Sequence, residues 1–155
     1  MGDEQATLKD RLATEMRTAM KERDAVRLAT LRLLTAAVKN REVELGHPLS
    51  DEEFVEVATR EVKRRREAIE AYEKAGREDR ASTERAEQRV LESYLPEALS
   101  EEELGALIEE AFQATAAASA GDLGKVMGYV MGKAKGRVDG KAVQARVRQR
   151  LDQTV

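Results

Sequence analysis

The chain has 155 residues, of which 41% are hydrophobic and 37% charged, and its formal net charge is −3 at pH 7. It contains no cysteine, which excludes disulfides and thiolate metal ligands. Its apolar stretches fall short of the roughly 20 residues that a membrane-spanning helix needs, and the N-terminal sequence has no apolar signal core. We therefore expect a cytoplasmic protein without a membrane segment.

The small net charge hides an asymmetry along the chain. Residues 121–155 contain eight basic and three acidic residues, a net charge of +5, whereas residues 1–120 have a net charge of −8. An acidic body with a basic C-terminal end indicates a polyanionic partner for that end.

Hydrophobic periodicity predicts helices through the first half of the chain. A first short helix has apolar residues four apart, and a second is expected to begin at the capping Asp24 and to end near residues 46–48. Ser50 opens a capping box over residues 50–53, which starts a third helix that should run to about Gly76. The polar stretch 77–88 is either an exposed helix or a mobile connection, and residues 90–95 form a further helical segment.

Pro96 marks a boundary, because proline cannot lie inside a helix and pushes the preceding residue out of helical geometry. A second capping box begins at Ser100, and Asp122 and Asp139 are expected to cap the two helices that follow. The sequence thus predicts an all-α fold. It has a longer N-terminal helical domain over residues 1–95 and a small C-terminal three-helix domain over residues 96–155.

Glycine recurs at every fourth position from residue 124 to residue 140. The spacing does not match a P-loop, since three residues rather than four separate Gly128 from Gly132 and Ala134 replaces the magnesium-binding hydroxyl. In a helix, Gly124, Gly128 and Gly132 flank one side of an apolar arc, and Lys125, Tyr129 and Lys133 flank the other. Each interior glycine costs roughly 1 kcal/mol relative to alanine, so either a neighbouring helix or a closely approaching partner must offset that cost.

The segment after this helix concentrates positive charge on pliable backbone. It contains Lys133, Lys135, Arg137 and Lys141, with Gly136 and Gly140 between them. Cations near a helix N-terminus are a common way to hold phosphate. A solvated basic turn is the alternative interpretation.

Four stretches of the sequence resemble the YqeY-like family, also called the GatB/YqeY domain. They are GDLGKVMGYVMGKAKGRVDGKAVQARV (121–147), DAVRLATLRLLTAAVKNREVE (24–44), EAIEAYEKAGREDRA (67–81) and YLPEALSEEEL (94–104). The resemblance covers nearly the whole chain in order. It implies an all-α protein, and it implies a connection with tRNA, because the same domain forms the tail of the B subunit of the glutamine-dependent amidotransferase that amidates Glu-tRNA(Gln) or Asp-tRNA(Asn).

Three functional hypotheses follow. The first is a non-catalytic tRNA-binding accessory, with no cofactor, that contacts phosphate through its basic glycine-rich end. Its candidate contacts are Lys125, Lys133, Lys135, Arg137, Lys141, Arg146 and Arg150, and the close-approach glycines are Gly124, Gly128, Gly132, Gly136 and Gly140. The second is a helical interaction module that docks on an amidotransferase or an aminoacyl-tRNA synthetase. The third, a carbon–nitrogen ligase activity with glutamine as amido donor, rests on family analogy only.

The sequence suggests no other site. The sole histidine, His47, precedes a proline in a predicted turn, and no catalytic or metal-binding set of residues surrounds it. The basic run at 63–66 has glutamates within helical reach, so we interpret it as a solvated face with ion pairs along one helix. The sequence does not indicate an oligomeric state.

Overall fold

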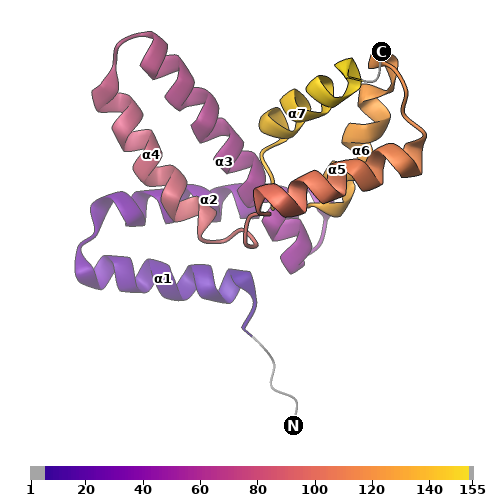
Figure 1. The fold of residues 1–155 in the computed structure, drawn as a ribbon. Coiled ribbons are helices and arrows are strands. Elements are labelled where there is room, and N and C mark those ends of the chain that lie inside the picture. Colours follow the sequence, from indigo (N-terminus) through magenta and orange to yellow (C-terminus); the bar gives the residue numbers. More distant parts are fainter. Residues whose placement is uncertain (1–5, 154–155) are drawn as a thin grey trace. The chain divides into compact units, whose positions relative to one another are not determined.

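A computed structural model describes residues 6–153 of the chain (Figure 1). These residues form seven α-helices and one short 3-10 helix, with no β-strand among them, so the all-α prediction is confirmed. The chain divides into two compact units, with the boundary between Leu95 and Pro96. That each unit folds as an independent domain stays a prediction.

The first unit consists of four helices. They are α1 (Leu8–Glu22), α2 (Ala25–Leu45), α3 (Asp51–Lys74) and α4 (Glu78–Glu92). Helices α3 and α4 form a hairpin, and α2 packs against α1, α3 and α4 (Figure 1). Its core is built from leucine and valine of α2 and α3 together with two aromatic rings, those of Phe54 and Tyr94.

Local signals in the sequence explain where these helices begin. The Asp24 carboxylate accepts a hydrogen bond from the backbone N–H of Arg27, and Ser50 and Glu53 form the expected reciprocal capping box. Residues 77–88 are not a mobile connection, because residues 78–88 belong to α4, which continues to Glu92 as one helix.

The second unit has three α-helices, α5 (Glu101–Thr115), α6 (Leu123–Lys133) and α7 (Gly140–Asp152), and a 3-10 turn at Ala120–Asp122. Ile108 and Phe112 of α5 pack with Val126 and Val130 of α6 and with the valines of α7 in one core. This core lies on the apolar faces that periodicity predicts for the three helices.

The caps of the second unit agree with prediction at two of three positions. Ser100 forms the capping box of α5, and Asp139 accepts from the backbone N–H of Lys141 at the start of α7. Asp122 precedes α6 but makes no side-chain capping bond to it, so the predicted cap is wrong. Because a 3-10 turn leads into α6, the Asp122 carboxylate accepts from the N–H groups of Ala118 and Ser119 instead, at 2.9 and 3.1 Å. These backbone hydrogen bonds lower the pKa of Asp122.

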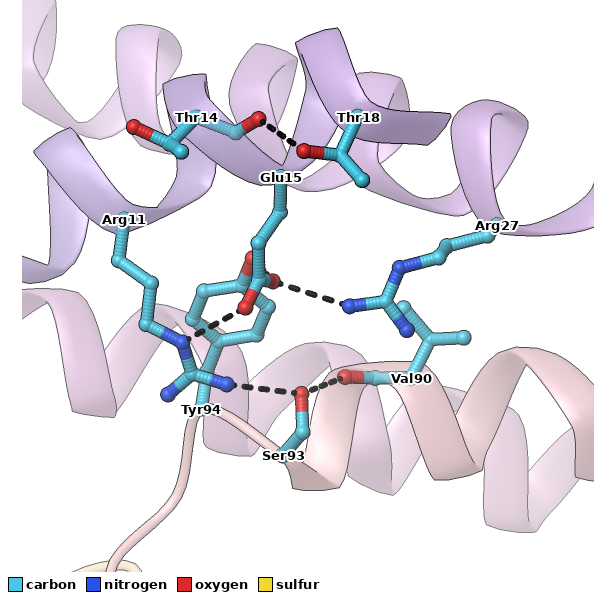
Figure 2. Close-up of polar contacts among 8 residues, drawn as sticks. All are labelled: Arg11, Thr14, Glu15, Thr18, Arg27, Val90, Ser93 and Tyr94. Carbon is cyan, nitrogen blue, oxygen red and sulfur yellow. Dashed lines mark hydrogen bonds and ion pairs between the residues drawn. The ribbon is translucent and has the colours of Figure 1, made fainter. Parts of the chain in front are cut away.

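A polar network built on Tyr94 joins the helices of the first unit (Figure 2). The Tyr94 side chain is 2% exposed, its ring lies 5.7 Å from that of Phe54, and its hydroxyl donates a hydrogen bond to the Glu15 carboxylate. Arg11 stacks over the ring at 4.3 Å and pairs with Glu15 at 2.9 Å, while Arg27 reaches the same carboxylate at 3.2 Å. Glu15 of α1 therefore links α2 with Tyr94, which lies two residues after the end of α4.

Burial and hydrogen bonding change the pKa of Glu15 in opposite directions. Burial raises the pKa of its carboxyl, but hydrogen bonds from Tyr94 and Arg11 and the charges of Arg11 and Arg27 outweigh it, so the pKa lies below the ordinary 4.5. Burial and the neighbouring carboxylate raise the pKa of the Tyr94 phenol. At neutral pH the pair is thus a neutral donor and a charged acceptor.

We expect Tyr94→Phe to lower the free energy of unfolding by about 1–3 kcal/mol, because a half-buried carboxylate loses a donor while the aromatic packing stays. Urea unfolding of Tyr94→Phe, Glu15→Gln and the double variant measures the coupling directly. A coupling energy near zero would contradict the network.

The depressed pKa of Glu15 also predicts a pH dependence. Its contribution to stability is fully present above pH 4.5 and is lost as the pH falls through the folded-state pKa, because the protonated acid no longer attracts Arg11 and Arg27. Unfolding curves between pH 7 and pH 3 should therefore show a smaller loss of stability for Glu15→Gln than for the wild type. Equal losses would show that Glu15 is not the group responsible.

Candidate nucleic-acid interface

The glycines of α6 face open space. A Cβ atom added at Gly124, Gly128 or Gly132 would meet no other atom within 4 Å, leaving out the helix's own nearby backbone, and all three residues are exposed. A neighbouring helix packed against this bare backbone was one of the two explanations that the sequence allowed. Within the described residues no such helix is present, so packing of a neighbouring helix does not explain these glycines.

A second column of side chains runs beside the glycines on the same helix. Lys125, Tyr129 and Lys133 follow one another at a spacing of four, and residues 123–133 contain no acidic side chain. The Lys133 Nζ lies 5.0 Å from the centre of the Tyr129 ring and 3.4 Å from Glu110 Oε1. Hydrogen bonding to Tyr129 and Glu110 raises the pKa of Lys133, so this lysine stays protonated at neutral pH.

The turn between α6 and α7 is fixed by Arg137 and Gly136. Gly136 has φ +72°, a left-handed conformation that side chains with a Cβ rarely adopt. The Arg137 Nε donates to the carbonyl of Glu97 at 2.8 Å, and the Arg137 carbonyl accepts from the N–H of Leu99 at 2.9 Å. Lys135, directly before Gly136, is exposed, and its side chain makes no polar contact within the described chain.

The arginines of α7 hold that helix to α5. Arg146 Nη1 lies 3.0 Å from Glu101 Oε2, and Arg150 pairs through two nitrogens with Glu109, the shorter distance being 2.8 Å. Hydrogen bonding to Glu109 raises the pKa of Arg150, and the same contact lowers the pKa of Glu109. Gly105 makes room for this arrangement, because a Cβ there would lie 3.3 Å from Arg146 Nη2.

The remaining predicted contacts are distributed around these features. Lys125 is exposed, with its Nζ 3.9 Å from Asp122. Lys141 lies in the first turn of α7, next to Gly140. A Cβ atom added at Gly140 would contact only the end of the Met131 side chain. The structure thus brings together Lys125, Lys133 and the glycines of α6, with Lys135 in the turn after it. Arg146 and Arg150 are instead engaged with α5.

The positive charge of residues 121–155 is balanced within its own unit. Residues 96–155 contain eight basic and nine acidic residues, a net charge of −1, because α5 carries five glutamates. Four of these, Glu101, Glu103, Glu109 and Glu110, pair with basic residues of α6, α7 or the turn between them. Sequence reasoning missed these partners, although the five glutamates of α5 and the lack of any basic residue in 96–120 could have indicated them.

Other charged groups of the described chain have structural explanations. His47 lies in the loop between α2 and α3, half exposed, with its Nε2 3.4 Å from Glu53. Arg65 does not pair only along its own helix, as the sequence suggested, but also reaches Glu84 and Glu87 of α4 at 3.4 and 3.0 Å. Burial and the charge of Glu87 raise the pKa of Glu84, which is the mark of a crowded helix contact.

Residues 6–153 lack the features of a metal site and of a membrane-spanning helix. No group of three or more histidine, cysteine, aspartate or glutamate residues there is placed to hold a metal ion. Among the helices of that same range, none has the length and apolarity to cross a membrane.

These features define an all-α protein with an exposed basic, glycine-lined helix in its second unit. The model of the YqeY-like protein family matches residues 9–151, so the chain belongs to that family, as the resemblance predicts. It is also similar to altered inheritance of mitochondria protein 41, a mitochondrial protein of Eremothecium gossypii, with 32% identity over 95 residues. The match covers 59% of this chain and 52% of that relative, about half of its length. The cytoplasmic location of this chain stays a prediction.

The open space at Gly128 and the strained backbone at Gly136 predict opposite effects of the same substitution. Gly128→Ala should raise the free energy of unfolding by roughly 0.5–1 kcal/mol, because alanine favours the helix and meets no neighbour. Gly136→Ala should lower it by about 1–2 kcal/mol, because alanine resists a φ of +72°. Thermal or urea unfolding of the two variants checks both signs, and a loss of stability in Gly128→Ala would show that this face is covered.

Proposed function

We propose that the chain is a non-catalytic, tRNA-associated accessory protein that contacts tRNA through α6 and the turn that follows it. The observation that carries the proposal is the exposed face of α6, where a glycine column runs beside Lys125, Tyr129 and Lys133 and no carboxylate lies on the helix. Bare backbone allows a sugar–phosphate strand to approach closely, and the lysines supply charge on one side of that approach.

The neighbouring ion pairs do not prevent such a contact. Lys133 and Lys125 pair with exposed or partly exposed carboxylates at 3.4 and 3.9 Å, and pairs of this kind contribute about 0–1 kcal/mol. A phosphate can therefore replace the carboxylate at small cost. Lys135 is exposed and makes no polar contact within the described residues, so it can meet phosphate directly.

The geometry supports a narrower contact set than the seven basic residues of the sequence prediction. Arg146 and Arg150 support the structure of the unit by joining α7 to α5, and Arg137 fixes the turn through the Glu97 carbonyl. We therefore assign the phosphate contacts to Lys125, Lys133 and Lys135. Tyr129, beside Lys133, has a hydroxyl that can hydrogen-bond to a 2′-hydroxyl and a ring on which a base can stack.

The second candidate function is a module that binds a helix of an amidotransferase or of an aminoacyl-tRNA synthetase. The net charge of −1 for residues 96–155 favours it, since a unit without excess positive charge exerts little long-range attraction on RNA. Glycine columns also let two helices pack closely. Only the family resemblance supports a relation to tRNA-dependent amidation. The same holds for a carbon–nitrogen ligase role with glutamine as amido donor.

We expect the full-length protein to bind total tRNA with an affinity that falls with salt. Three phosphate contacts predict a log–log slope of about −2 to −3, at about −0.7 to −0.9 per contact. The triple variant Lys125→Glu, Lys133→Glu, Lys135→Glu should lose this binding, as measured by filter binding or fluorescence anisotropy across a salt series.

The matched control carries the same change of charge in the first unit, at Lys21, Lys63 and Lys74, which are all exposed. It should keep most of the affinity of the wild type. Equal losses in the two variants, or no binding by the wild type at low salt, would contradict the RNA proposal and leave the helix-binding function.

The glycine column gives a prediction with two readouts. The triple variant Gly124→Ala, Gly128→Ala, Gly132→Ala should unfold at a higher temperature than the wild type, because three interior glycines leave the helix. Its affinity for tRNA should nevertheless fall, because three methyl groups block close approach to the backbone. A variant that is more stable and binds tRNA as tightly as the wild type would show that the glycines are not part of the interface.

A further inference from the structure

Helix α2 has apolar side chains on two opposite faces. Leu31, Leu34 and Val38 point into the core of the first unit, where α1, α3 and α4 pack against the helix. The opposite face carries Val26, Leu33 and Val43, which are 48%, 50% and 82% exposed. Together with Met20 of α1 these are the most exposed large hydrophobic side chains of the described residues.

The exposed face follows a heptad pattern. Apolar or small residues alternate at steps of three and four, and Asn40 is the one polar member; the six positions are Val26, Ala29, Leu33, Ala36, Asn40 and Val43, all exposed. We call this set the α2 seam. With Val26 as position a, the seam supplies a and d positions over 18 residues, about 27 Å of helix. Such spacing lines up side chains for contact with one further helix.

Asn40 indicates the kind of helix that fits. It lies at an a position and is exposed, and its side chain makes no hydrogen bond within the described residues. In parallel two-stranded coiled coils an asparagine at a faces the same asparagine of the other strand, and the pair of amides bond to each other. A polar residue that satisfies itself across a two-fold axis favours a second copy of this chain over an unrelated helix.

The charges beside the seam favour the same arrangement. Lys39 lies at position g and Glu44, five residues later, at position e, which is the spacing that joins two parallel strands by opposite charges. Glu44 is largely exposed and already accepts from Arg41 at 2.8 Å, so one of its oxygens remains open to a lysine of the other copy. An antiparallel pair would instead bring Arg32 of one copy near Lys39 of the other, and like charges repel.

We propose that the α2 seam is a homodimer interface in which the α2 helices of two copies pack in parallel and in register. The contact buries Leu33 and Val26 against their counterparts and pairs Asn40 with Asn40. Ala29 and Ala36 at the d positions let the helices approach closely but bury little area, so the dimer is concentration-dependent. This proposal is independent of the tRNA contact, which lies on the second unit.

The absence of cysteine from the chain makes cross-linking a clean test. In the proposed dimer Asn40→Cys places the two thiols opposite each other, so mild oxidation should give a disulfide-linked dimer in high yield. The control is Ala13→Cys, at an exposed position on α1. An antiparallel pair would place residue 40 opposite residue 29 of the other copy, so a low yield, or equal yields at residues 40 and 13, would overturn the proposal.

Sedimentation velocity of the full chain gives the second measurement. From about 5 µM to about 1 mM, a range that covers weak self-association, the wild type should shift from monomer to dimer. Leu33→Glu should weaken dimerisation at least tenfold with an unchanged circular dichroism spectrum, and Ala13→Glu should have no effect. A wild type that stays monomeric at 1 mM, or a Leu33→Glu variant that dimerises normally, would overturn the proposal.

A charge exchange tests the register. Lys39→Glu and Glu44→Lys should each weaken the dimer, because each puts like charges at the g and e positions, and the double variant should restore it. Loss of affinity in the double variant beyond that of either single change would overturn the parallel register.

Discussion

The first unit depends on one buried phenol. Tyr94 lies two residues after the end of α4 and places its ring against Phe54 of α3. Its hydroxyl donates to the Glu15 carboxylate of α1, which in turn pairs with Arg27 of α2 (Figure 2). One side chain thus fixes elements that are far apart in the sequence. Pro96 comes two residues later, where the second unit begins.

Most of the fold could be predicted because its signals are local. Capping residues such as Ser50 and Ser100 and the 3.6-residue period of the apolar faces act within one or two turns of helix, and the structure agrees with them. The cap at Asp122 could not be predicted in the same way, since it depends on the 3-10 turn that leads into α6. The polar stretch 77–88 was ambiguous because it has little apolar periodicity, and the packing of α4 on α3 is a tertiary contact that the sequence does not display.

The candidate site was predictable only in part. The spacing of residues along the chain predicts the glycine column and the lysines beside it. Whether another helix covers Gly128 depends on tertiary packing, which periodicity does not predict. The larger omission was electrostatic. Net charge summed along a segment made the C-terminal end look strongly basic, whereas Glu109 and Glu110 of α5 lie across from Arg150 and Lys133 in space.

That acidic helix has a consequence for selectivity. The carboxylates of α5 already pair with basic side chains of their own unit. An anion that binds there must replace a carboxylate, so its net binding free energy is only the difference between the two interactions. A lone phosphate or a single acidic side chain gains little by such an exchange. A ligand with several phosphates on one rigid backbone can replace several carboxylates but loses its translational freedom only once. Its affinity, compared with that of a single phosphate, therefore increases with each contact. Under the RNA proposal, binding at the cations that α5 occupies, such as Lys133, therefore favours a ligand with several phosphates over a small anion.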